Sequence, residues 1–221
     1  MNKVFKVKWF FVVVFILLTL IVSILVFPTT VQAKKINYKN YYKFVECKEC
    51  ESGYDSNYID DYGNPRQYGV KMCEKHEKKI SEEAKFYDYG YTDYNCLAYS
   101  LGETEPCNWK WPISWGKSPK KGFVERYLKW KNYEVEDFDA SKMDYYRQQN
   151  AVLVYAYQTF LTKEYIVTHF ARTTDLEGNI VEGADTISKW GAGGIYSTKT
   201  ASNPYVKGTG YGECVMAFYK K

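Results

Sequence analysis

One short stretch in the middle of the chain decides the predicted fold: Asn95-Cys96-Leu97-Ala98-Tyr99-Ser100-Leu101-Gly102. Asn95 is a favourable N-cap and Gly102 a favourable residue just past a C-terminus, so the stretch predicts a short helix. Cys96 falls on its first turn, where unpaired backbone N–H groups and the helix dipole lower the pKa of a thiol. Cys96 is therefore a candidate nucleophile. The alternative is a small buried thiol that only fills the core.

A nucleophilic cysteine needs a base, and the chain contains only two histidines. His169 lies in a run of β-branched and aromatic residues, 164–172, that predicts a strand. Strict alternation would place Tyr165, Val167 and His169 on one face of that strand. We expect His169 to act as the base of Cys96. Taken without Cys96, it would be an ordinary hydrogen-bonded histidine.

The surrounding sequence predicts a mixed α+β domain over residues 86–221. The other predicted elements are strands over residues 151–158 and 213–219, a strand ending near residue 191, and helices over residues 71–86 and 122–131. In the last of these helices, Phe123, Tyr127 and Trp130 are expected to face inward. Residues 36–46 and 54–70 show no sustained period and are predicted to be largely loop.

Four motifs carry a family resemblance, and they come in this order: Asn95-Cys96-Leu97-Ala98-Tyr99-Ser100-Leu101-Gly102, Trp109-Lys110-Trp111-Pro112, His169-Phe170-Ala171-Arg172 and Ser188-Lys189-Trp190-Gly191. Together they resemble an uncharacterised bacterial family with a papain-like, NlpC/P60-like core, over about residues 86–219. The resemblance implies a helix that begins with the cysteine and packs on an antiparallel sheet, with the histidine on a central strand.

The same resemblance implies roles for individual residues. Cys96 and His169 match the catalytic pair, and Ser188 falls where a third residue would orient the imidazole. Asn, Asp or His is more usual at that third position, so Asp185 and Asn179 are rival candidates. Asn95 is a further candidate, with a role at the oxyanion: its side-chain N–H would help the backbone N–H of Cys96 to stabilise the negative charge.

A second group of residues has the spacing of a metal site. Cys47-x2-Cys50 and Cys73-x2-His76 supply three thiolates and one imidazole in two short knuckles, 22 residues apart. Zn²⁺ is held by four such ligands at the corners of a tetrahedron. We therefore predict structural zinc knuckles within a Tyr-, Asn- and Asp-rich N-terminal region, residues 34–85, and no cofactor that catalysis requires.

The alternative for the cysteines is a set of disulfides. An exported chain with six cysteines could form three bridges, and 15 connectivities are open. Three cysteines in a metal site, one catalytic thiol and a bridge between Cys107 and Cys214 would also account for all six.

The N-terminus has the layout of an export signal. Residues 1–8 contain three lysines, residues 9–27 contain no charge, and small residues at Val31 and Ala33 suit a cleavage site. We predict a signal peptide over residues 1–33. An uncleaved signal-anchor is the alternative, because 19 uncharged residues, of which only Thr19 and Ser23 are polar, span roughly 28 Å as a helix. Either way, residues 34–221 are expected to be secreted or anchored on the outer face of the cytoplasmic membrane.

Composition narrows the classes of partner. The chain has 221 residues and a net charge of +4, of which three charges come from Lys3, Lys6 and Lys8, leaving 4 − 3 = +1 on the rest. A near-neutral body argues against binding to nucleic acid, which needs a concentrated basic face. Contact with a membrane is expected only through the N-terminal segment, and the sequence leaves the oligomeric state open.

These observations favour an exported thiol hydrolase, peptidase- or amidase-like, that cleaves an amide bond in cell-wall peptide or protein. Transfer to an amine uses the same pair and stays open. The first alternative is a non-catalytic binding module for cell-wall carbohydrate or protein, because 23 Tyr, 12 Phe and 6 Trp exceed what a core needs. The second is a secreted effector that modifies proteins. Trp109, Trp111 and Trp115 are predicted to form either a lid or a wall for substrate.

Overall fold

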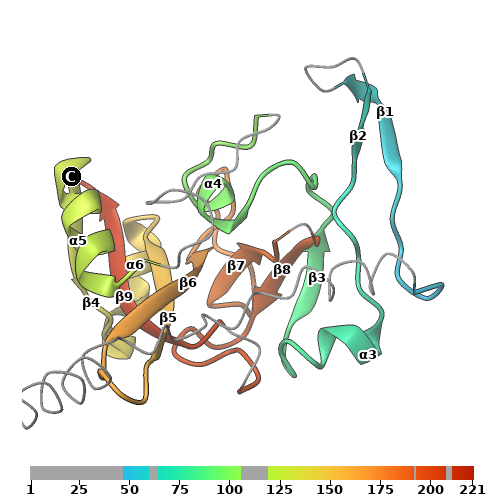
Figure 1. The fold of residues 1–221 in the computed structure, drawn as a ribbon. Coiled ribbons are helices and arrows are strands. Elements are labelled where there is room, and N and C mark those ends of the chain that lie inside the picture. The colour runs from blue at the N-terminus through green and yellow to red at the C-terminus, as the bar shows by residue number, and fades with distance from the viewer. Residues whose placement is uncertain (1–46, 60–63, 106–118, 192, 208–210) are drawn as a thin grey trace, which may run out of the picture. The chain divides into compact units, whose positions relative to one another are not determined.

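The computed structural model describes residues 47–59, 64–105, 119–191, 193–207 and 211–221 (Figure 1). Its central feature is an antiparallel sheet with the strand order β3-β8-β7-β6-β5-β9-β4. The strands are β3 (Lys85–Asp88), β4 (Tyr133–Asp137), β5 (Val152–Gln158), β6 (Tyr165–Arg172), β7 (Thr186–Lys189), β8 (Ile195–Thr198) and β9 (Glu213–Lys220). The other elements are β1 (Tyr54–Ile59), β2 (Pro65–Gln67), α3 (Glu74–Glu77), α4 (Cys96–Ser100), α5 (Lys121–Trp130), a 3-10 turn (Ala140–Lys142) and α6 (Met143–Gln148).

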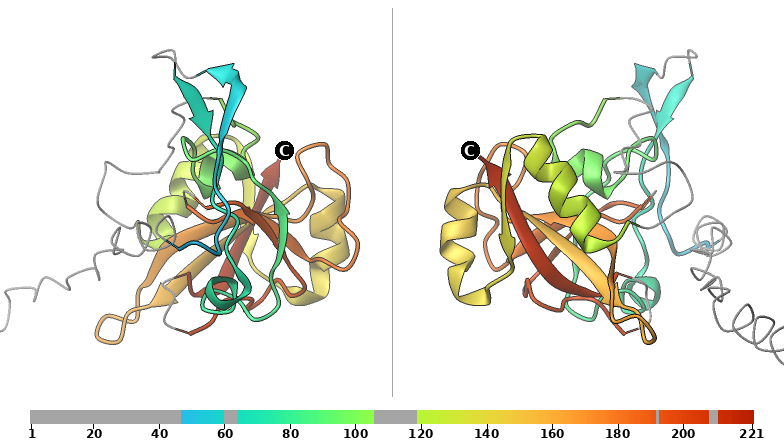
Figure 2. Two further views of the ribbon diagram at one scale, coloured as in Figure 1. Left: turned by 90° about the vertical axis from the view of Figure 1, so that its right-hand side faces the viewer. Right: turned by 60° about the vertical axis from the view of Figure 1, so that its left-hand side comes forward.

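Helices cover both faces of this sheet, as the views in Figures 1 and 2 show. Leu97 of α4 and Leu128 of α5 share an apolar cluster with Val154 of β5. Leu153, the residue before Val154, belongs instead to a cluster with Tyr146 of α6. Consecutive strand residues point to opposite faces, so α4 and α5 lie on one face and α6 on the other. This confirms a mixed helix-and-sheet domain with a large antiparallel sheet.

Helix α4 packs on β6 and β7, two strands that, in the described part of the chain, share only one residue pair. β6 and β7 are paired through Arg172 and Ile187, and α4 contacts both strands. Figure 1 shows α4 beside the β6 and β7 strands. Because the first residue of α4 is Cys96, this arrangement brings the thiol to the centre of the sheet rather than to its edge.

A β-bulge in β6 corrects the alternation expected from sequence. Tyr155 pairs with His169, but Ala156 pairs with Val167, so Thr168 is an extra residue in the ladder. Val167 therefore joins the apolar cluster under α4, whereas the ring of His169 lies against Tyr155. The prediction that Val167 and His169 share a face is wrong, because strict alternation assumes an uninterrupted ladder.

Helix α5 has the expected position but a different buried stripe. Val124 and Leu128 are buried, whereas Trp130 is 75% exposed and Phe123 is 38% exposed. The two aliphatic residues lie one turn apart and pack under the sheet, which leaves the larger aromatic rings outside. The expectation that Phe123 and Trp130 face inward is therefore wrong.

Two further predictions about the N-terminal region need correction. Residues 71–86 form only the single turn of α3 followed by the start of β3, not a continuous helix. Within residues 54–70, predicted as loop, β1 and β2 form an antiparallel hairpin. The elements α3 and β3 depend on partners distant in sequence. Strand β3 pairs with β8, and α3 carries His76 of the cysteine cluster.

Among the described residues, no helix combines the length and apolar character needed to cross a bilayer. The predicted signal segment, residues 1–33, lies outside the described residues, as do Cys107 and the tryptophans of residues 106–118.

Candidate functional site

Helix α4 forms as predicted, and the residues at its two ends explain why. Asn95 has an extended backbone, and its side-chain oxygen accepts a hydrogen bond from the Ala98 N–H at 3.0 Å. At the other end, Gly102 adopts a φ of +73°, a conformation that glycine tolerates without a Cβ clash. Every residue of α4 is buried. The helix is therefore a fixed part of the core, and Cys96 is held at its first position.

Burial dominates the electrostatics of Cys96. The side chain is 7% exposed, and burial raises the pKa of the thiol to about 11. The backbone N–H groups of Phe170 and Leu97 and the charge of Lys189 act in the opposite direction and lower that pKa. In this structure Cys96 is a neutral, free thiol surrounded by groups that favour its ionised form.

His169 is equally buried, on the neighbouring strand. It is 1% exposed, and its ring stacks on Tyr211 with centroids 4.3 Å apart and meets Tyr205 edge-on at 5.3 Å. Burial lowers the pKa of His169 to about 3, so the ring is neutral. Its Nε2 atom is buried without a hydrogen-bond partner among the described residues.

Cys96 belongs to the apolar cluster under α4, whereas the ring of His169 lies against Tyr155 and Tyr205, which belong to the cluster on the other face of the sheet. The sulfur lies beside the backbone N–H of Phe170, the residue that follows His169. Tyr205 and Tyr211 contact the His169 ring, and the charge of Cys96 acts on both tyrosines. Within the described part of the chain, no hydrogen bond links the sulfur to the imidazole. The catalytic pair stays a prediction.

The other predicted residues have defined partners. Ser188 is fully buried, and its hydroxyl lies 3.3 Å from the Tyr205 hydroxyl and accepts a bond from the Trp190 ring N–H at 3.1 Å. Among the described residues, the Tyr205 ring lies between this hydroxyl and His169 as their shared partner. Asp185 forms an ion pair with Arg147 at 2.5 Å.

The last rival for the third role, Asn179, donates to Asp175 at 3.1 Å, in the turn after β6. Neither rival has a contact to His169 among the described residues. Asn95 serves as the helix cap, so its role at an oxyanion stays a prediction.

Lys189 is a buried charged residue beside α4 to which the sequence patterns assign no role. It lies in β7 directly after Ser188, and it is fully buried. Its Nζ atom donates hydrogen bonds to the carbonyl oxygens of Gly191 (2.8 Å) and Gly193. A lysine inside a run of strand-forming residues is the sequence feature that could have indicated a buried charge, but a lysine on the surface of a strand gives the same pattern.

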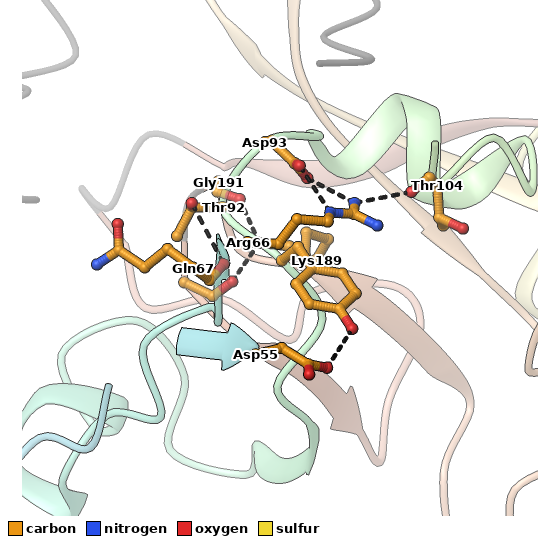
Figure 3. A network of polar contacts seen from close by, with 10 residues as sticks. Asp55, Arg66, Gln67, Thr92, Asp93, Thr104, Lys189 and Gly191 are labelled. Atoms are coloured by element: carbon orange, nitrogen blue, oxygen red, sulfur yellow. Dashed lines mark hydrogen bonds and ion pairs between the residues drawn. The ribbon is translucent and has the colours of Figure 1, made fainter. Parts of the chain in front are cut away.

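A buried ion pair fixes the segment that carries α4. Arg66 of β2 donates two hydrogen bonds of 2.8 Å to Asp93, before the helix, and one of 3.0 Å to the Thr104 carbonyl, after it. Figure 3 shows this arrangement, with Lys189 close by. The Arg66 guanidinium also lies over the Tyr91 ring, 3.8 Å from its centroid. The hairpin thus holds both ends of the segment around Cys96.

The four predicted metal ligands do gather. Their ligating atoms all lie within 4.8 Å of one another: those of Cys47, Cys50, Cys73 and His76. The His76 Nδ1 atom is 3.2 Å from the Cys50 sulfur and 3.4 Å from the Cys73 sulfur. Tetrahedral ligands of one zinc ion would be separated by about 3.5 to 3.8 Å. The cluster could therefore hold a metal ion.

Backbone pairing explains why the two knuckles meet. Glu51 and Lys71 exchange two backbone hydrogen bonds of 2.9 Å, directly after Cys50 and shortly before Cys73. Cys73 is then the N-cap of α3, which carries His76. All three cysteines of the cluster are free thiols, and burial lowers the pKa of His76, which favours the neutral ring that binds metals.

The predicted partner of Cys214, Cys107, lies outside the described residues. Cys214 is a free thiol in this structure and points at the Met216 carbonyl at 3.8 Å. The bridge between Cys107 and Cys214 stays a prediction.

Comparison with known proteins adds one family. No curated protein and no solved structure matches the chain. A family model with the description "Domain of unknown function (DUF7689)" matches residues 87–219. This range includes α4, the whole of β6 and β7, and hence Cys96, His169 and Lys189, whereas the metal cluster precedes it. The chain belongs to the family described as Domain of unknown function (DUF7689).

Proposed function

We propose that this chain is an exported thiol hydrolase of the papain-like class, which cleaves an amide bond in cell-wall peptide or protein. One observation supports it most. The sulfur of Cys96, at the first turn of a helix, lies beside the residue next to His169, whose buried Nε2 atom has no hydrogen-bond partner among the described residues. A nucleophile at a helix start and an unoccupied base on the adjoining strand are the parts that the chemistry needs.

In this proposal, His169 takes the proton of the Cys96 thiol, and the thiolate attacks the carbonyl carbon of the amide. The backbone N–H of Cys96 stabilises the oxyanion. Collapse of the tetrahedral intermediate breaks the C–N bond, and the amine leaves with the proton from His169. Water then hydrolyses the thioester and restores the thiol. Both groups are buried and neutral in this structure, so the proposed reaction requires substrate or water to reach them.

The burial of both groups also favours a second candidate, a binding module in which Cys96 is an inert core thiol. Its binding surface would include the exposed tyrosines of β1, Tyr54 (69%) and Tyr58 (57%). Flat aromatic rings at such positions suit sugar rings or flat protein surfaces. The two candidates differ in one measurable property, the reactivity of Cys96.

A thiol-directed fluorescent probe should therefore label Cys96 in the wild-type chain. His169→Gln should slow labelling by about tenfold or more, because the thiolate is the reactive form and loses its base. Ile166→Ala, on the same strand, is the matched control and should label at the wild-type rate. Cys96→Ala identifies the labelled residue by mass spectrometry.

Equal labelling of wild type and His169→Gln would contradict the catalytic pair. Absence of labelling at Cys96, together with sedimentation of the Cys96→Ala chain with purified cell walls, would support the binding module instead.

We further propose that the metal ion of the Cys47, Cys50, Cys73 and His76 cluster is structural zinc. Three thiolates and one imidazole fill a tetrahedral shell and leave no open position for catalysis. Metal analysis of the purified chain should return about one zinc per chain. Cys50→Ser should lose most of it, whereas Cys214→Ser, a free thiol elsewhere in the fold, should retain it. A wild-type chain without bound metal would exclude the proposal.

A further inference from the structure

Lys189 occupies a position that a lysine rarely has. It is fully buried in β7, between the sheet and α4. Lysine is almost never completely buried without a charged partner, because removing an ammonium ion from water is costly. The residue therefore requires an explanation beyond packing.

The hydrogen bonds of Lys189 do not supply a countercharge. Its Nζ atom donates to the carbonyl oxygens of Gly191 and Gly193, which are dipoles without net charge. An ammonium group has three N–H donors, so these carbonyls use two of them. No carboxylate of the described residues lies within ion-pair distance of Nζ.

The carboxylate whose charge acts on Lys189 is already paired with an arginine. The charge of Asp93 acts on Lys189, but Arg66 holds that carboxylate by two hydrogen bonds of 2.8 Å (Figure 3). A bidentate pair of this kind satisfies both charges. The other acidic group that acts on Lys189 is Cys96, on the first turn of α4. The centroid of the Tyr94 ring, two residues before Cys96, lies 5.3 Å from Nζ, so Lys189 contacts the segment that leads into α4.

We propose that the Lys189 ammonium is the countercharge of the Cys96 thiolate and stabilises that thiolate across the contact between β7 and α4. The inference deepens the proposed function and rests on Cys96 being its reacting group. The proposed role of Lys189 is to make the thiolate easier to form. This role does not depend on whether His169 or another group receives the thiol proton.

The mutual effects on ionisation agree with this geometry. Burial lowers the pKa of Lys189 to about 7, and the charges of Asp93 and Cys96 raise it. Burial raises the pKa of Cys96, and the charge of Lys189 lowers it. The ionisable groups that face this pair from the packed elements are Asp93 and Tyr94 before α4, and Tyr205 and Tyr211 beside the thiol.

The pH profile of alkylation by iodoacetamide tests the proposal. Lys189→Gln retains two N–H donors for the glycine carbonyls but removes the charge, whereas Lys189→Arg retains the charge. Below about pH 7, where Lys189 is protonated, Cys96 should be alkylated about tenfold more slowly in Lys189→Gln than in wild type, because the thiolate loses its countercharge and less of it forms. Lys189→Arg and the exposed control Lys199→Gln should keep the wild-type rate in that range. A folded Lys189→Gln chain with the wild-type profile would overturn the proposal.

A reciprocal measurement covers the case in which the Lys189 variants do not fold. A mutual interaction between two ionising groups shifts both pKa values. In a chain with ¹³C-labelled lysine, the titration of Lys189 should lie at higher pH in Cys96→Asp than in Cys96→Ser, because the aspartate carries a negative charge at the place of the thiolate whereas serine stays neutral. The same titration in both variants would refute the coupling. Because neither measurement uses a substrate, slower alkylation of Cys96 in Lys189→Gln combined with wild-type labelling of His169→Gln would support this inference and reject the catalytic pair.

Discussion

Arg66→Met is expected to lower the free energy of unfolding by about 3 kcal/mol, since removing one partner of a buried ion pair leaves the other charge uncompensated. The Arg66 side chain is 7% exposed and that of Asp93 is 19% exposed. Arg66 also bonds to the Thr104 carbonyl and covers the Tyr91 ring, so methionine replaces only part of its packing. Urea denaturation followed by circular dichroism measures the change.

A double-mutant cycle separates the charge from the packing. Asp93→Asn removes the uncompensated carboxylate, so Arg66→Met combined with Asp93→Asn should be less destabilised than the sum of the single variants. Lys78→Met is the matched control. Its ion pair with Glu74 is exposed, with side chains 61% and 78% accessible, and its loss should leave stability nearly unchanged. Additive effects of the Arg66 and Asp93 substitutions would show that the pair contributes no coupling.

The ion pair also shows what sequence patterns omit. Arg66 and Asp93 are 27 residues apart and lie in segments without a regular period, so no local signal joins them. Helix α4 could be predicted because its N-cap, Asn95, and the glycine after its C-terminus, Gly102, are local signals. The metal knuckles could also be predicted from local sequence, because two ligands separated by two residues are typical of a turn that binds zinc.

The predictions of secondary structure are wrong where partners distant in sequence override the local preference of the residues. The charged run over residues 71–86 has helical residues, yet pairing of β3 with β8 and the cysteine cluster limit it to one turn. In β6, the bulge at Thr168 moves Val167 and His169 to different faces, and nothing in the residues 164–172 signals an extra residue. Lys189 was missed because a lysine in a strand usually marks an exposed edge.

The pH dependence of stability should report the environment of His169. Its pKa is about 3 in the folded chain and near 6.5 when unfolded. Below pH 6.5 the unfolded chain therefore binds a proton that the folded chain excludes. The contribution of the neutral ring to stability is complete above pH 6.5 and is lost as the pH falls toward 3. At pH 4 the stability lost through His169 should be about 3.5 kcal/mol, from about 1.4 kcal/mol for each of the 2.5 pH units below 6.5.

His169→Gln isolates this contribution, because the carboxylates that titrate in the same range are common to both chains. The variant should be less stable at pH 7, where it loses the ring contacts with Tyr205 and Tyr211, but should lose about 3.5 kcal/mol less than wild type between pH 7 and pH 4. Parallel stability curves would mean that water reaches the ring. That outcome would contradict the buried state seen here, and it would favour the hydrolase over an inert core, because a hydrated His169 titrates near neutral pH, where a base for Cys96 must work.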